Sequence, residues 1–134
     1  MKVHVLWYDY YEDSGIVGIY TAEGKQKKIE ELQQEALQYC KIWGIEYEKA
    51  LAKKKEEREI HLKKVNQAIE ACKNAPENKL LKQLKKKLIK EDESLLRNIH
   101  CLQKDVEKYI LPEKALEVYM RDENLIWLEK EVIE

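Results

Sequence analysis

Two runs of apolar and aromatic residues open the chain, at about residues 3–11 and 16–20, and Glu-Asp-Ser-Gly separates them at 12–15. Short apolar runs around a turn sequence predict a β-hairpin, with Gly15 free to take a positive φ in the turn. Gly18 lies inside the second run and predicts a bulge or a close backbone approach.

The first predicted strand is apolar or aromatic on both faces. Its alternation puts Val3, Val5 and Trp7 on one face, and His4, Leu6, Tyr8 and Tyr10 on the other. A strand with one face in water would alternate polar with apolar residues, and this strand does so poorly. One face is expected to build a core, which leaves the other for a partner.

A helical pattern begins after Tyr20. Thr21 can cap the free N–H groups of a helix that starts at Ala22. Apolar residues then recur at steps of three and four and should lie on the sheet: Ile29, Leu32, Ala36, Tyr39 and Trp43. We expect a break or kink at Gly44, because one unbroken helix from Ala22 to Ala75 would be about 80 Å long.

Residues 45–110 predict a long antiparallel helical hairpin. Residues 74–78, Asn-Ala-Pro-Glu-Asn, form the expected turn, with Pro76 at the start of the second helix. The apolar seam has heptad-like spacing: Leu62, Val65, Ile69 and Cys72, then Leu81, Leu84, Leu88, Leu95, Ile99, Leu102, Val106 and Tyr109. Folding at the turn should bring Cys72 near Leu80, Ile69 near Leu84 and Val65 near Leu88.

The middle of this hairpin is mismatched. Residues 52–59, Ala-Lys-Lys-Lys-Glu-Glu-Arg-Glu, offer almost nothing apolar to Leu95, Leu96 and Ile99. Either lysine stems cover these three side chains, or a second chain does. We favour the second chain, and predict a homodimer or higher even oligomer with Leu95, Leu96 and Ile99 at its interface.

The end of the chain should return to the sheet. Pro112 ends the second long helix. Residues 115–120 fit either a short helix or a strand, and the pattern does not separate the two. Residues 124–133 predict a strand, which would be the third beside the N-terminal hairpin.

The sequence therefore predicts an α+β, mostly helical fold. A small antiparallel sheet is made by the N-terminal hairpin and the C-terminal strand and is covered by a helix, and a long coiled-coil-like helical hairpin joins it. We expect a single domain over residues 1–134, with residues 1–44 and 111–134 forming a small α/β head and residues 45–110 forming a rod.

The charge of the chain is high but balanced. Charged residues make up 38% of the sequence, above the usual quarter, and 26 acidic residues nearly cancel 25 basic ones. The whole chain is therefore neither a polyanion nor a general nucleic-acid binder. Such a composition is typical of long helices exposed to solvent.

The sequence predicts a cytoplasmic protein with no membrane segment. Its N-terminus lacks the apolar core and cleavage site of a signal peptide, and no apolar run has transmembrane length. Cys40, Cys72 and Cys101 are an odd number of cysteines in helical segments, which favours reduced, buried thiols over a disulfide framework.

Residues 2–37 and 124–133 contain a strand, a second strand that runs into a helix, and a last strand in which acidic and apolar residues alternate. Val17, Tyr20, Thr21 and Glu23 match a pattern in which the second strand runs into Val-(Phe or Tyr)-Ser-Thr. In these residues the chain resembles a family of short uncharacterised proteins of bacteria and their phages. The helical hairpin is an insertion outside the usual pattern. The resemblance implies a phage or prophage origin and a bacterial host cytosol, but no activity and no functional residues.

No catalytic, cofactor or metal site is predicted. His4, His61 and His100 lack zinc-site spacing relative to the cysteines. No cysteine has a base that the sequence alone would pair with it. Gly-rich phosphate loops, nucleophile elbows and dinucleotide fingerprints are absent from the sequence. We expect a protein that is not an enzyme and holds no cofactor.

Two groups of residues are candidate binding sites. The first is aromatic and is expected to contact a protein partner: Trp7, Tyr8, Tyr10, Tyr11 and Trp127. The second is a basic patch near the turn of the hairpin: Lys79, Lys82, Lys85, Lys86, Lys87 and Lys90. The plain alternatives are that the aromatic residues only fill a small core and that the lysines only face solvent.

The function predicted from these patterns is non-enzymatic interaction. As a phage-type protein, the chain would act as an oligomer that binds and blocks, or scaffolds, a host protein. The alternative is a binder of nucleic acid or nucleotides that uses the basic patch or the aromatic sheet.

Overall fold

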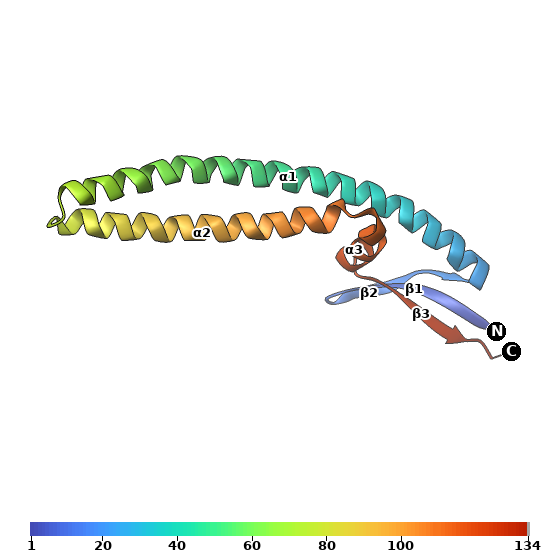
Figure 1. The fold of residues 1–134 in the computed structure, drawn as a ribbon. Helices are drawn as coiled ribbons and strands as arrows, with labels where there is room; N and C mark the ends of the chain where they lie inside the picture. Colours follow the sequence, from blue (N-terminus) through green and yellow to red (C-terminus); the bar gives the residue numbers. More distant parts are fainter. Residues whose placement is uncertain (134) are drawn as a thin grey trace. The chain divides into compact units, whose positions relative to one another are not determined.

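The computed structural model describes residues 1–133 of the chain. Its elements follow in the order β1 (Lys2–Tyr10), β2 (Asp13–Tyr20), α1 (Ala22–Asn74), α2 (Lys79–Ile110), the 3-10 helix η1 (Pro112–Lys114), α3 (Ala115–Asp122) and β3 (Leu125–Glu131) (Figure 1). The predicted α+β fold with a helical hairpin is confirmed. Residues 115–120, which the sequence left open, belong to helix α3.

The chain forms two compact units. The first consists of Met1–Gly44 together with the chain from Lys108 onward, and the second is Ile45–Glu107. The first unit contains the sheet, α3, and the N-terminal part of α1. The second contains the helical hairpin.

The sheet has the strand order β2-β1-β3, and both neighbouring pairs are antiparallel. β3 is therefore the third strand that the sequence predicts, and it pairs with β1. The predicted turn is wrong in position, since Tyr10 pairs with Asp13 and only Tyr11 and Glu12 connect the strands. Tyr11 has the positive φ of 51°, and Gly15 lies within β2. A two-residue hairpin loop needs a positive φ inside the loop, which Gly15 is too far along the chain to supply.

A bulge in β2 confirms the prediction at Gly18. Leu6 pairs with Gly18 and Trp7 pairs with Ile16, so Val17 is an extra residue in β2. The Tyr20 ring lies directly over Gly18, and a Cβ on Gly18 would be 2.7 Å from its Cε2 atom. The bulge changes which side chains share a face, because Ile16 and Ile19 now point to the same side of the sheet.

Helix α1 begins where the sequence predicts. The Thr21 hydroxyl oxygen accepts a hydrogen bond from the Gly24 N–H at 3.1 Å, as a helix cap does. The predicted break at Gly44 is wrong, because α1 continues to Asn74. A single glycine costs only about 1 kcal/mol in a helix, and Gly44 is buried beside the side chain of Tyr109.

The turn of the hairpin lies at residues 75–78, within the predicted turn. The Asn78 side-chain oxygen accepts hydrogen bonds from the N–H groups of Leu80 and Leu81 at 3.1 and 3.2 Å. Asn78 is therefore the cap of α2, and the prediction that Pro76 begins this helix is wrong. An asparagine oxygen can satisfy free N–H groups at a helix start, which a proline side chain cannot.

Inward positions of the hairpin alternate in steps of four and three residues. They are Tyr47, Leu51, Lys54, Arg58, His61, Val65, Ala68 and Cys72 on α1, and Leu81, Lys85, Leu88, Asp92, Leu95, Ile99, Leu102 and Val106 on α2. The predicted seam is wrong at Leu80 and Leu84, whose side chains are exposed. Heptad spacing from Leu81 to Leu88 passes through Lys85 and leaves Leu84 beside the seam.

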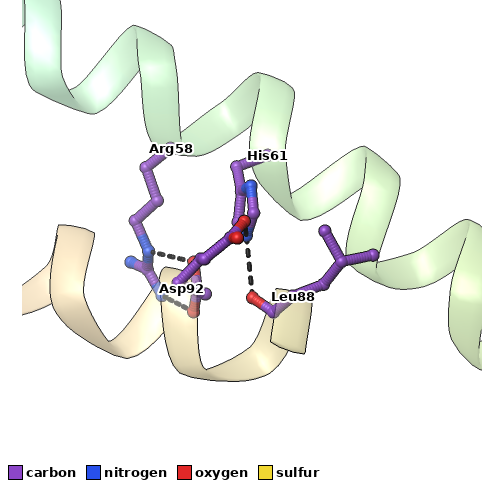
Figure 2. A network of polar contacts seen from close by, with 5 residues as sticks. Arg58, His61, Leu88 and Asp92 are labelled. Atoms are coloured by element: carbon purple, nitrogen blue, oxygen red, sulfur yellow. Dashed lines mark hydrogen bonds and ion pairs between the residues drawn. The ribbon is translucent and has the colours of Figure 1, made fainter. Parts of the chain in front are cut away.

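Polar side chains fill the middle of this seam (Figure 2). Arg58 Nε and Asp92 Oδ1 are 3.1 Å apart, and His61 Nε2 donates a hydrogen bond to the Leu88 carbonyl oxygen at 2.7 Å. Arg58 lies within the charged segment 52–59, and His61 follows that segment by two residues. They occupy inward positions, so their carbon atoms replace the missing apolar side chains.

The prediction that Leu95, Leu96 and Ile99 are poorly covered within one chain is therefore wrong. Ile99 is only 5% exposed, and Leu95 and Leu96 are half-buried within the single chain. Leu62, Arg58 and Lys55 line one depression together with Leu96 and Ile99. The burial of these three side chains removes the reason for placing an oligomer interface at Leu95, Leu96 and Ile99, while the oligomeric state itself stays a prediction.

Candidate functional site

One face of the sheet is apolar and carries no helix of its own unit. Residues paired directly across antiparallel strands share a face. The pairs of Val5 with Ile19 and Leu128, and of Trp7 with Ile16 and Ile126, therefore put these side chains on one face. We call this set, with Val3, the open face: Val3, Val5, Trp7, Ile16, Ile19, Ile126 and Leu128.

The outer strands expose most of the open face. Ile16 is 54% exposed, Ile19 62%, Ile126 48% and Leu128 40%. The central strand is more protected, because Val5 is buried between its neighbours and Trp7 is half-buried. Four large branched side chains around a tryptophan form a contiguous apolar surface, and the largest such surface of a protein is often functional.

The opposite face of the sheet is covered. In the first unit, the N-terminal part of α1 and helix α3 lie on the same side of the sheet (Figure 1). Leu6 on that face is fully buried, and it lines a depression with Leu32 of α1 and Tyr119 of α3. Lys25 Nζ of α1 lies over the Trp127 ring, 5.2 Å from its centre, so Trp127 lies beside α1. This covered face is the core of the unit.

The predicted aromatic site does not form one cluster. Trp7 lies on the open face, whereas Tyr8 and Trp127 lie on the covered face by their register. Tyr10 and Tyr11 lie at the hairpin loop, where their rings meet edge to face at 4.7 Å. Of the five predicted residues, Trp7 alone belongs to the open face.

Sequence reasoning missed the four aliphatic residues of the open face: Ile16, Ile19, Ile126 and Leu128. Ile16 and Ile19 are three residues apart, and regular alternation would place them on opposite faces. The signal was Gly18, which marks the bulge that brings both to one face. The pairing of β3 with β1 then adds Ile126 and Leu128.

A second cluster surrounds the carboxylate of Asp122 in the first unit. The hydroxyls of Tyr109 and Tyr39 donate hydrogen bonds to Asp122 Oδ2 at 2.6 and 2.9 Å, and Lys108 Nζ lies 3.3 Å from Oδ1. Partial burial alone would raise the pKa of Asp122, but these three donors reverse the effect and hold its pKa below the ordinary value. We call these four side chains the Asp122 network.

The tyrosines of this region are poor candidates for chemistry. Burial, followed by the bond to Asp122, raises the pKa of Tyr39 well above its ordinary value. Burial and the bond to Glu35 raise the pKa of Tyr119 to about 12. Both hydroxyls therefore stay protonated at neutral pH and act as hydrogen-bond donors. The Asp122 network joins α1, α2 and α3, which is a structural role.

Three residues of the predicted basic patch, Lys82, Lys85 and Lys86, line a groove near the turn of the hairpin. Lys79, Lys82, Lys86, Lys87 and Lys90 are exposed, and we call these five residues the lysine tip. The sixth predicted residue, Lys85, lies half-buried at the seam, so its assignment to a free surface is wrong. A groove of about 460 Å³ has Ile69, Cys72 and Pro76 on its apolar side and Lys82 and Lys86 among its charged lining.

The histidines and cysteines do not converge. Cys40 is buried, which raises the pKa of its thiol, Cys72 is half-buried, and Cys101 is exposed. The expectation of three buried thiols is therefore wrong for Cys101. Within residues 1–133, no three side chains of histidine, cysteine, aspartate or glutamate are grouped as metal ligands would be. None of the helices described has the length and apolar character that a membrane span requires.

Comparison with known proteins identified no relative of this chain. No protein-family model, no curated protein and no solved structure matches the chain. The resemblance to short proteins of bacteria and phages stays a prediction. The features that bear on function are the open face and the lysine tip.

Proposed function

We propose that this chain is a non-enzymatic interaction protein that binds another protein chain through the open face. The observation that carries the proposal is the exposure of Ile16, Ile19, Ile126 and Leu128 on one side of a sheet whose other side is a packed core. Complete burial of each such side chain is worth about 1.5–3 kcal/mol. These side chains are partly exposed, so covering them gains part of this free energy and favours association.

The composition of the open face supports binding to protein. Large apolar side chains lie near its centre around Trp7, and tryptophan is prominent among the residues that dominate binding energy. Its strands present side chains from a rigid, hydrogen-bonded sheet, so little conformational entropy is lost when they are covered. In the role that we propose, the chain blocks or scaffolds a protein of a bacterial host cell, and acts in the cytosol.

Replacing Ile19 by lysine should abolish this association. The substitution puts a charge at the most exposed of the four aliphatic positions of the open face, and burying an unpaired charge is strongly unfavourable. The measurement is retention of protein chains, including untagged copies of this chain, by the immobilised tagged protein in a host extract. We expect the wild type to retain a specific chain and Ile19→Lys to lose it.

Ile60→Lys is the matched control for this experiment. Ile60 is 60% exposed and Ile19 is 62% exposed, but Ile60 belongs to the helical hairpin of the second unit and is not part of the open face. The control variant should retain what the wild type retains. Equal retention by the wild type, Ile19→Lys and Ile60→Lys would exclude the open face as the binding site.

A second candidate function is binding of nucleic acid through the lysine tip. The observation that favours it is the local charge, since residues 79–90 contain six lysines and no acidic residue in a chain of net charge −1. Five of these lysines are exposed, and two of the five, Lys82 and Lys86, line a groove. Phosphate groups are the ligands that such a surface would attract, by a mechanism that releases counterions.

Replacing Lys82, Lys86 and Lys87 together by glutamine tests this second function. If the tip contacts phosphates, the variant should bind DNA or RNA more weakly, and the slope of log affinity against log salt should fall by about 3. Folding stability should change by less than about 1 kcal/mol for each residue, because these side chains are exposed. Fluorescence anisotropy of a labelled oligonucleotide over a salt series measures the slope.

The control variant replaces Lys49, Lys53 and Lys55 by glutamine, since these exposed lysines lie on α1 outside the tip. Both variants change the net charge equally. An identical loss of binding in the two variants would show only a general charge effect, and no binding by the wild type at low salt would rule the second function out.

A further inference from the structure

The open face has side-chain charges of opposite sign at its two ends. Asp9 follows Trp7 by two residues on β1 and therefore continues the open face at the end near the hairpin loop. Lys130 pairs with Val3 and marks the other end. Both side chains are exposed, and within residues 1–133 neither forms an ion pair. The face is thus apolar in the middle, acidic at one end and basic at the other.

This charge distribution is self-complementary. A two-fold axis that crosses the strands turns a second copy of the sheet end for end, so that Asp9 faces the partner's Lys130. An axis parallel to the central strand β1 would instead place Asp9 over the partner's Asp9, and like charges oppose association. Sheets packed face to face are about 10 Å apart, which extended aspartate and lysine side chains span together.

We propose that the open face binds the open face of a second copy of this chain, with the strands of the two sheets antiparallel. The inference rests on the proposed function and names the partner of that site. Trp7 and Val5 of one copy pack on the same residues of the other near the axis. Asp9 and the partner's Lys130 form an ion pair at each end, which fixes the direction of the second sheet.

The size of the face sets the strength of the dimer. β3 has seven residues, so at about 3.3 Å per residue and 4.8 Å between strands the face measures about 23 Å by 14 Å. Stable interfaces bury about 800 Å² per partner, and this footprint is smaller. The dimer should therefore be reversible, with a dissociation constant on the order of micromolar.

Charge reversal provides the test. Sedimentation equilibrium of the full chain, over about 5 to 500 μM at low salt, measures the dissociation constant in the range expected for such an interface. Asp9→Lys and Lys130→Asp should each weaken the dimer by about tenfold or more, because each places like charges together. The double variant should regain a dissociation constant within about threefold of the wild type, because the pair is restored with reversed signs.

Each result decides a separate question. A wild-type chain that stays monomeric over the whole range overturns the inference, and so does a double variant no better than the single ones. The wild-type chain could be monomeric and yet retain a different protein from the extract, which the Ile19→Lys variant fails to retain. In that case the proposed function stands, and a second copy of the chain is not the partner. A dimer unaffected by Ile19→Lys overturns the inference, because that dimer forms through another surface. Only equal retention of extract proteins by the wild type, Ile19→Lys and Ile60→Lys overturns the proposed function.

Discussion

Replacing Leu6 by alanine should lower the free energy of unfolding by about 2–5 kcal/mol, the range for large-to-small changes in a packed core. Leu6 is fully buried on the covered face of the sheet. Its removal leaves a cavity between β1 and the helices, and those helices close only part of it. Urea denaturation, followed by circular dichroism, measures the difference.

The matched substitution on the other side of the sheet is Ile19→Thr. Threonine keeps the β-branched shape that suits a strand, and Ile19 is mostly exposed in the single chain. At concentrations where the protein is monomeric, this change should cost less than about 1 kcal/mol. Equal losses for Leu6→Ala and Ile19→Thr would mean that both faces are packed, and the open face would not be free to bind.

Replacing Asp122 by alanine should have the second-largest effect, a loss of about 2–3 kcal/mol of unfolding free energy at neutral pH. The change removes an acceptor from the Tyr109 hydroxyl, the Tyr39 hydroxyl and the Lys108 ammonium group together. These donors come from α1 and α2, while Asp122 is at the end of α3. Glu123→Ala is the control, since Glu123 is an exposed acid at the next position.

The effect of Asp122 should depend on pH in a defined direction. Its pKa is lower in the folded chain than in the unfolded chain, so the unfolded chain binds a proton first as the pH falls. The contribution of the carboxylate is therefore complete above about pH 4 and is lost as the pH falls through the folded pKa. The stability difference between wild type and Asp122→Ala should narrow below about pH 4. A difference that stays constant down to pH 2 would contradict the network.

The sequence predicts the elements of this protein well, because hydrophobic periodicity and caps are local. Thr21 marks the start of α1, Gly18 marks the bulge, and residues 124–133 contain the third strand. The break predicted at Gly44 fails for a tertiary reason. One glycine is a small cost to a helix, and contact with Tyr109 at that point is not visible in the local pattern.

The hairpin shows a different limit. A charged segment such as residues 52–59 looks unable to build a seam, yet Lys54 and Arg58 occupy inward positions. Counting apolar residues overlooks side chains whose carbon atoms pack while their charged ends find a partner, as Arg58 does with Asp92. For the same reason the sequence pattern predicted Lys85 on the surface and Leu84 in the seam, whereas Lys85 is half-buried and Leu84 is exposed.

The candidate site needed the sheet register. The sequence suggests that one face of β1 is left for a partner, but it groups Trp7 with Tyr8 and Trp127, which face the core. Only the bulge at Val17 and the pairing of β3 show that aliphatic residues from three strands surround Trp7. Such long-range pairing is not encoded in any single segment.

The most direct test of the open face uses the three tryptophans as reporters. Trp7 lies on the open face, Trp127 on the covered face, and Trp43 on α1. Fluorine NMR of protein labelled with fluorotryptophan, with each resonance assigned by substitution to phenylalanine, follows all three while the protein concentration is raised or a captured partner is added. If the open face is the binding surface, the Trp7 resonance should shift and the Trp43 and Trp127 resonances should not. A shift of Trp43 or Trp127 with an unchanged Trp7 would contradict it.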